Sequence, residues 1–242
     1  MKIATIGCSH SSDYAGDSWP IFLSKELGAE LVQAYSAGAG NEMNIEKLKW
    51  ILYEKPDLII VQLTDPIRLV VGLDKHVVRS QVNLDGRPWY GHSNHFDGNY
   101  FYTFNAWENN SNLSKMMNQE IDADSFMLAG PISSEYNMNY KVLHTMSTMA
   151  FMAQTKNIPI VFFSWSVDIH KIIKKCGYTD LFQNLNIIPG YTEQFISERA
   201  LQPVPKGQPG EGHQGPKNQE RIAKEFVLPY LKLTHGQLCT GG

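Results

Sequence analysis

Residues 57–63 have the sequence DLIIVQL, a nearly continuous aliphatic run that decides the fold class. Such a run is typical of a strand that is buried on both faces of a parallel sheet. Further out, short apolar runs at 2–6 (KIATI) and 31–35 predict two more strands, and apolar residues at helical spacing predict helices at 19–27 and 41–53. Strands and helices that alternate in this way predict a right-handed parallel α/β sheet.

The same pattern returns in the second half of the chain. We expect a long helix at 137–156, a buried strand at 158–165 (IPIVFFSW), a short helix at 167–175, a last strand at 185–188 and a closing helix at 217–231. Residues 72–131 lose this periodicity and are rich in aromatic, Asn and Gly residues, so we interpret them as an insertion. The prediction is a single domain over residues 1–242. Its fold class is α/β, a three-layer α/β/α flavodoxin-like sandwich with a central parallel sheet of about five strands.

Composition excludes several classes of protein. The 242 residues include 21 Lys and Arg against 24 Asp and Glu, a net charge of −3, and 43% of them are hydrophobic. This apolar content excludes global disorder, and the lack of a basic block argues against binding to nucleic acid or to an anionic membrane. Three cysteines are too few for a disulfide scaffold, and no apolar run approaches the roughly 18 residues of a membrane helix. The start, MKIATIGCSH, lacks the apolar run of a secretory leader, so we expect a cytoplasmic protein.

The loop after the first predicted strand, GCSHSSD at residues 7–13, places Ser9 at the carboxyl edge of the sheet. Open parallel sheets bind their ligands at this edge, near the point where the strand order reverses. A serine hydroxyl is an effective nucleophile once a neighbouring base takes its proton. The alternative is that Ser9, Ser11 and Ser12 only cap the next helix.

Two further loops bring polar groups to the same edge. In SAGAGN (36–41), Gly38 and Gly40 permit close approach of the backbone to a ligand, and the Asn41 amide can donate to an oxyanion. This loop lacks the third glycine of a dinucleotide fingerprint, and no phosphate-binding P-loop motif occurs in the chain. In EGHQGPK (211–217), His213 is a candidate general base and Glu211 is the nearest carboxylate that could orient it. The alternative is an ordinary surface histidine.

Taken together, these loops resemble the sequence blocks of the SGNH (GDSL-like) hydrolase family. GCSHS resembles the first block, whose serine is the nucleophile, with Cys8 where the family has Asp. SAGAGN resembles the second block, whose glycine supplies a backbone oxyanion donor, here Gly40. GEGHQGPK resembles the last block, which carries the catalytic histidine ahead of a helix. The third block of the family, Gly-x-Asn, appears here as QLTDPIR without the Asn, so Asn41, Thr64 and Arg68 are the candidate replacement donors.

The resemblance implies a hydrolase, esterase- or deacetylase-like, that cleaves a small acyl or carbohydrate ester. It implies that Ser9 attacks the ester carbonyl, that His213 takes the serine proton and that Glu211 orients the imidazole. In some members of the family a backbone carbonyl orients the histidine instead. No cofactor and no metal are implied, and the expected partner is the ester substrate rather than a nucleic acid or a membrane.

Other functions stay open at this point. A catalytically weakened domain of this family could act as a glycan-binding, protein-binding or structural module, because the third-block Asn is missing and aromatic residues crowd the insertion. A flavodoxin-like binder of a small ligand is a third hypothesis. The aromatic residues between Trp89 and Trp107 could stack on sugars, form the insertion's own core or join subunits of a homo-oligomer. His92 and His95 have ligand spacing, but no second pair accompanies them, so we favour polar loop residues over a metal site.

Overall fold

Five parallel strands form the central sheet, in the order β2-β1-β3-β7-β8. They are β1 (Lys2–Gly7), β2 (Glu30–Tyr35), β3 (Leu58–Leu63), β7 (Ile160–Ser164) and β8 (Asn186–Ile187). Each strand runs parallel to its neighbours. The computed structural model describes residues 1–13, 16–35, 40–66, 68–73, 92–96, 99–105, 135–208 and 211–239. Within these residues, the predicted parallel sheet of five strands is confirmed.

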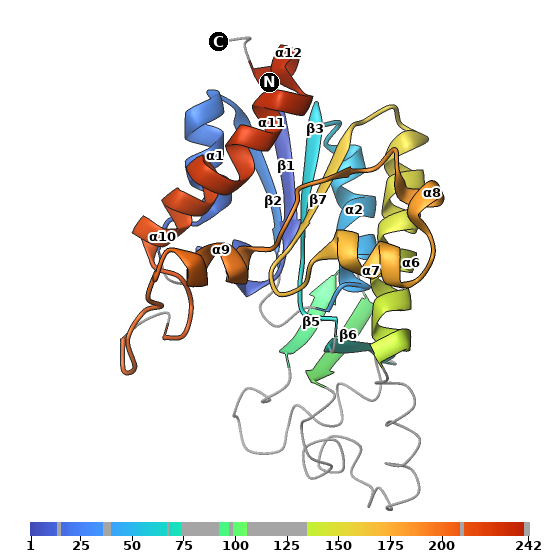
Figure 1. Ribbon diagram of the computed structural model, residues 1–242, viewed down its shortest axis with the longest axis horizontal. Coiled ribbons are helices and arrows are strands. Elements are labelled where there is room, and N and C mark those ends of the chain that lie inside the picture. The colour runs from blue at the N-terminus through green and yellow to red at the C-terminus, as the bar shows by residue number, and fades with distance from the viewer. Residues whose placement is uncertain are drawn as a thin grey trace, which may run out of the picture.

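Helices cover both faces of the sheet and complete a three-layer sandwich (Figure 1). One face carries α1 (Trp19–Leu27), α9 (Thr192–Glu198), α10 (Pro216–Arg221), the π-helical segment η2 (Ile222–Val227) and α11 (Leu228–Thr234), which leads into α12 (Gly236–Cys239). The other face carries α2 (Met43–Tyr53), α6 (Glu135–Gln154), α7 (Ile169–Lys175) and α8 (Thr179–Phe182). The predicted helices are present, whereas α8 and α9 were not predicted. None of the described helices is both long and apolar enough to cross a bilayer.

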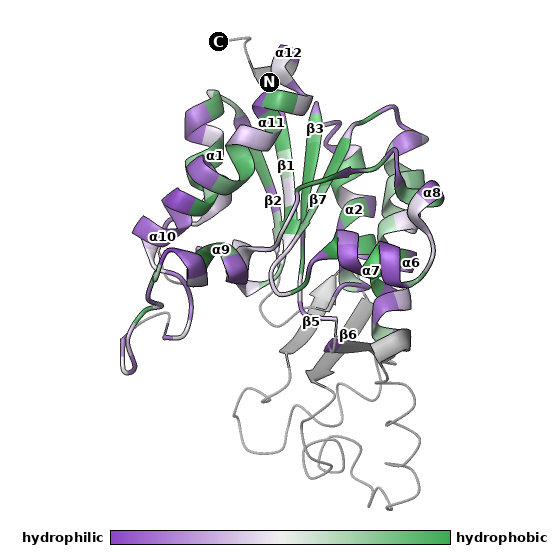
Figure 2. Ribbon diagram, in the orientation of Figure 1, coloured by the Kyte–Doolittle hydropathy of each residue, from purple (hydrophilic) through white to green (hydrophobic). Residues whose placement is uncertain are grey.

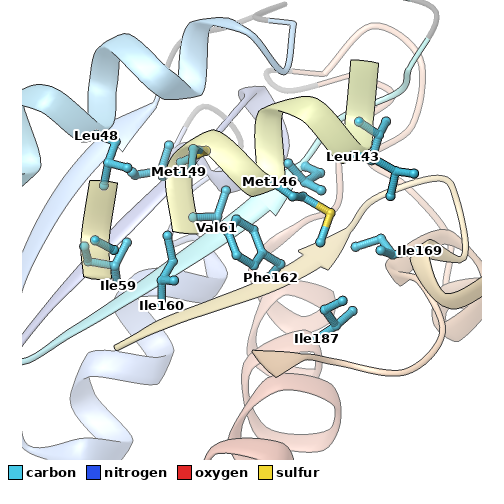
Figure 3. Close-up of a cluster of buried hydrophobic side chains, with 14 of the residues drawn as sticks. Leu48, Ile59, Val61, Leu143, Met146, Met149, Ile160, Phe162, Ile169 and Ile187 are labelled. Atoms are coloured by element: carbon cyan, nitrogen blue, oxygen red, sulfur yellow. The ribbon is translucent and has the colours of Figure 1, made fainter. Parts of the chain in front are cut away.

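The alternation of side chains along the strands divides the hydrophobic core into two clusters. Ile59 of β3 belongs to the cluster under α2 and α6, whereas the next residue, Ile60, belongs to the cluster under α1 and α11. Figure 3 shows the first cluster, in which Leu48 of α2 and Met146 and Met149 of α6 lie over the strands. Figure 2 shows the hydrophobic strands enclosed between helices that carry both hydrophilic and hydrophobic residues. All six residues of β3 are buried, as expected for a strand covered on both faces.

A second sheet has three antiparallel strands in the order β4-β6-β5. These strands are β4 (Arg68–Leu73), β5 (His92–Phe96) and β6 (Asn99–Asn105), and β5 and β6 lie beyond the carboxyl ends of β1 and β3 (Figure 1). The sequence did not predict them, because stretches such as HSNHF alternate only weakly between apolar and polar residues. The insertion proposed for residues 72–131 stays a prediction. Residues 74–91 and 106–134, which include Trp89 and Trp107, lie outside the described residues.

Candidate active site

The candidate site lies where the strand order of the main sheet reverses. Strand β1 has β2 on one side and β3 on the other. The first crossover of the chain therefore leads to one side of β1, and the later strands lie on its other side. This switch point is the place where open parallel sheets bind their ligands. The turns that directly follow β1 and β3 carry Ser9 and Thr64, and Gly40 and Asn41 precede α2 after the end of β2.

Ser9 begins a single turn of 3₁₀ helix, η1 (Ser9–Ser11), directly after β1. The Ser11 N–H donates to the Cys8 carbonyl at 2.9 Å, and the Ser12 N–H donates to the Ser9 carbonyl at 3.2 Å. The Ser12 hydroxyl donates to that same Ser9 carbonyl at 2.7 Å. None of these serines caps the following α-helix, since the N-cap of α1 is Ser18. The capping alternative is therefore wrong.

Buried side chains of β3 and α1 hold this turn from behind. The Ser11 hydroxyl donates to Gln62 Oε1 at 2.5 Å and accepts from Trp19 Nε1 at 3.3 Å. Gly7 is needed beneath them, because a Cβ at this position would lie 2.0 Å from Ser11 Oγ. Gln62 interrupts the aliphatic run LIIVQL of β3 with a polar side chain, and this was the sequence signal for a buried polar contact that we missed.

His213 lies in a loop that closes on itself ahead of α10. The Val204 N–H donates to the His213 carbonyl at 2.8 Å, and the Gly212 N–H donates to the Val204 carbonyl at 3.2 Å. His213 Nδ1 lies 3.2 Å from the backbone carbonyl oxygen of Glu211. The Glu211 carboxylate instead accepts a hydrogen bond from the Gly207 N–H at 2.8 Å. The contact that orients the imidazole thus comes from the main chain of Glu211.

Gln219 of α10 joins the His213 loop to the Ser9 turn. Its side chain is buried, and its Oε1 accepts from the Trp19 N–H at 3.1 Å. Its Nε2 donates to the carbonyl of His10 at 3.4 Å and to the carbonyl of Gln214 at 3.3 Å. One amide side chain therefore links three segments: the turn after β1, the start of α1 and the residue that follows His213. No local sequence pattern indicates this contact, because Gln219 and His10 lie 209 residues apart in the chain.

His10, the residue after Ser9, lies between Trp165 and His213. Its ring stacks on Trp165 with centroids 3.5 Å apart and an interplanar angle of 10°, and its centroid lies 5.2 Å from that of His213. Burial, together with smaller electrostatic contributions from His213 and Arg68, lowers the pKa of His10 to about 3. His10 is therefore neutral at pH 7, and its buried Nδ1 has no hydrogen-bond partner among the described residues. These contacts place the His213 imidazole beside the Ser9 turn.

Asn41 and Thr64 connect the loop before α2 to the turn after β3. The Thr64 N–H donates to Asn41 Oδ1 at 2.8 Å, and Asn41 Nδ2 donates to the Thr64 carbonyl at 3.1 Å. Both residues are buried, and Thr64 Oγ1 has no partner among the described groups. Arg68 begins β4, and its N–H donates to the Asp65 carbonyl at 3.2 Å. The Asn41 amide thus holds the Thr64 backbone.

Among the described residues, metal-ligating side chains do not gather at this edge. The part of the chain that the structure describes contains no group of three or more His, Cys, Asp or Glu residues that could hold a metal ion. The backbone of His92 and His95 lies in β5, but the placement of their side chains, like that of His76, Asp85 and Asp97, is outside the described residues.

Comparisons with known proteins identify the fold. No protein-family model and no curated protein matches the sequence. The crystal structure of TesA matches with a TM-score of 0.53 and 14% identity, covering 96% of this chain and 99% of that one. The psychrotrophic esterase EstA from Pseudoalteromonas sp. matches with a TM-score of 0.52 and 12% identity, covering 97% and 98%. A protein described as lipolytic and of the G-D-S-L family, from Desulfitobacterium hafniense DCB-2, has a TM-score of 0.49 and 11% identity, covering 95% and 99%.

The chain has the fold of TesA and of the esterase EstA. In this fold the described residues bring together the Ser9 turn, the Asn41–Thr64 bridge, Arg68 and the His213 loop. The Glu211 carboxylate is bound to Gly207 rather than to the imidazole, and Gly38 lies outside the described residues. Identities this low establish the fold, and the chemistry is argued from the site alone.

Proposed function

We propose that this protein is a serine ester hydrolase of the SGNH type, with Ser9 as the nucleophile and His213 as the general base. The observation that carries the proposal is the contact between the rings of His213 and His10, which brings a distant loop against the turn that begins with Ser9. An ester as the substrate class is supported by the fold, which this chain shares with a protein described as an esterase. The proposed substrate is a small acyl or carbohydrate ester.

In the proposed reaction, the Ser9 hydroxyl oxygen attacks the ester carbonyl carbon while His213 Nε2 accepts the hydroxyl proton. The N–H groups of Ser9 and Gly40 stabilise the negative charge that develops on the carbonyl oxygen. The tetrahedral intermediate then expels the alcohol, which takes the proton from His213, and the acyl group remains on Ser9. A water molecule, deprotonated by His213, attacks this acyl ester and releases the carboxylic acid with the Ser9 hydroxyl restored.

The tautomer of His213 follows from its contact with Glu211. A backbone carbonyl only accepts hydrogen bonds, so Nδ1 at 3.2 Å must carry the proton that it donates. Nε2 is then the free base that the reaction requires. We therefore assign the orienting role to the Glu211 carbonyl, and we assign to the Asn41 amide, which is bound to Thr64, the role of holding the oxyanion loops together.

The proposal is tested with p-nitrophenyl acetate and butyrate. Ser9→Ala and His213→Ala should each lower kcat by about 10³-fold or more. The matched controls are Ser197→Ala and His170→Ala, which alter an exposed serine of α9 and an exposed histidine of α7 and should leave hydrolysis unchanged. Hydrolysis that persists in Ser9→Ala contradicts the proposal. A wild-type protein that hydrolyses no ester, but binds a glycan or another protein as tightly as the Ser9→Ala variant does, would instead support the binding-module alternative.

A conservative change at Glu211 separates the two ways of orienting His213. Glu211→Gln keeps the backbone carbonyl and removes the charge of the carboxylate, so kcat should stay within about threefold of the wild-type value. The same ester assay measures it. A loss comparable to that of His213→Ala would assign the role to the carboxylate instead.

A further inference from the structure

Lys47 of α2 is a lysine inside the hydrophobic core, with an exposed fraction of 0%. It lies one helical turn from Met43 and one from Ile51, which are also fully buried, so its side chain is directed inward. Its Nζ donates to the carbonyl oxygen of Gly7 at 2.6 Å and to Asn44 Oδ1 at 3.3 Å. A buried ammonium group is costly unless it is hydrogen-bonded, so a core position of this kind requires an explanation.

The surroundings of Lys47 do not neutralise its charge. Both of its hydrogen-bond acceptors are neutral, and the described residues include no carboxylate that forms an ion pair with it. The titratable and charged groups that act on it are Cys8, which directly follows β1, and Arg68, at the start of β4. Burial lowers the pKa of Lys47 to about 7, while Cys8 raises it and the Arg68 charge lowers it. A mixture of protonated and neutral amine therefore exists near neutral pH.

The acceptor of the shorter bond is the last residue of the strand that leads to the nucleophile. Gly7 ends β1, and Ser9 starts the next turn. The N···O distance of 2.6 Å is slightly shorter than the roughly 2.7–2.9 Å that is usual for hydrogen bonds from a charged donor. Ser11 and Gln62 hold the same turn through β3, so Lys47 adds an independent attachment through α2.

We propose that Lys47 is a positioning residue for this site. Its protonated amine binds the Gly7 carbonyl and so holds the Ser9 turn in place. Its positive charge stabilises the negative charge that develops on the ester carbonyl oxygen during hydrolysis. This inference rests on the proposed function. A fixed charge in a region of low dielectric acts more strongly on a developing oxyanion than the same charge would in water. Lys47 does not touch the substrate, so its effect is on kcat rather than on KM.

The pH profile separates this role from a merely structural one. If the protonated amine is the active form, kcat/KM of the wild-type enzyme falls above about pH 7. Lys47→Met should lower kcat/KM at pH 6.5 by roughly tenfold or more and should remove the alkaline limb. Lys49→Met, on the exposed side of the same helix, is the matched control and should keep both the rate and the limb.

Several outcomes would overturn the inference. One is a wild-type profile that stays flat between pH 7 and 9, which needs no variant to fold. Another is Lys47→Met activity within twofold of wild type, or a reduced activity that keeps the wild-type alkaline limb. A loss of kcat at every pH without a change in the profile would show that Lys47 supports the fold only.

Failure of the proposed function gives a different result. In that case the wild-type protein neither hydrolyses esters nor reacts with a fluorophosphonate. Whether Lys47 holds the Ser9 turn in place can then still be measured, through the accessibility of the buried Cys8 thiol. With Cys176 and Cys239 changed to Ser, Lys47→Met should raise the rate of Cys8 alkylation by iodoacetamide roughly tenfold over Lys49→Met. Equal rates would overturn the hold on the turn as well.

Discussion

Replacing Lys47 by methionine is expected to change how the stability of the protein depends on pH. The side chain is fully buried, and burial lowers its pKa from 10.5 to about 7. Below pH 7 the amine is protonated in both the folded and the unfolded chain, so it adds no pH dependence. Between pH 7 and 10.5 the unfolded chain keeps a proton that the folded chain has lost, so the free energy of unfolding rises with pH in this window.

The size of this effect follows from the pKa change. A fall from 10.5 to about 7 corresponds to about 5 kcal/mol across the window, or about 1.4 kcal/mol for each pH unit. Methionine has no titrating group, and it leaves the Gly7 carbonyl without its donor, at a cost of about 1–3 kcal/mol that does not vary with pH. The stability difference between wild type and Lys47→Met should therefore grow in favour of the wild type as the pH rises.

The assay is equilibrium unfolding in urea at pH 6, 7, 8, 9 and 10, with wild type, Lys47→Met and the exposed control Lys49→Met measured in parallel. Other lysines and tyrosines titrate equally in all three proteins, so the difference between variants isolates Lys47. Lys49→Met should give a difference that is constant with pH. Parallel curves for wild type and Lys47→Met would refute the argument, since they would mean that Lys47 titrates alike in the folded and unfolded chains.

Three further changes have expected outcomes. Gly7→Ala places a Cβ 2.0 Å from Ser11 Oγ and should lower the free energy of unfolding by about 1–3 kcal/mol in urea titrations, while an unchanged midpoint would show that Ser11 moves without cost. Gln219→Leu removes the link between the Ser9 turn and the His213 loop, so under the proposed function it should lower kcat roughly tenfold with KM unchanged in the ester assay. An unchanged kcat would show that the two loops meet without this link. Between pH 6.5 and about 3, His10 is protonated in the unfolded chain but neutral in the folded chain. The free energy of unfolding of the wild type should therefore fall on acidification through this range, and that of His10→Phe should fall less. Equal losses in the two proteins would contradict the neutral state of His10.

The parts of the fold that local sequence signals specify were predicted well. Helix α1 was expected at 19–27 and is found at Trp19–Leu27, because Pro20 suits its first turn and Gly28 supplies the left-handed residue, with φ of 57°, that ends it. Strand β3 was expected from an aliphatic run that only a doubly covered strand accommodates. In both cases a few neighbouring residues carry the whole signal.

Contacts between distant segments account for most of what was missed. The amide of Gln219 bonds the carbonyl of His10, 209 residues away in the chain, and no local pattern announces such a pair. Lys47 was detectable, because helical spacing places it in line with the apolar Met43 and Ile51, but a lysine on the core face contradicts the usual preference of the residue for solvent. The Glu211 carboxylate was expected to orient His213, whereas in the structure the imidazole contacts the backbone carbonyl of Glu211. The sequence cannot distinguish these two groups, because both belong to the same residue.

Labelling with a fluorophosphonate tests the central assignment most directly, because the reagent reacts with an activated serine and needs no knowledge of the substrate. Intact-mass measurement followed by peptide mapping should find one adduct per chain, located on Ser9. The adduct should be absent from Ser9→Ala, strongly reduced in His213→Ala and unchanged in Ser197→Ala. An adduct on another residue, or labelling that survives in Ser9→Ala, would contradict the assignment of Ser9 as the nucleophile.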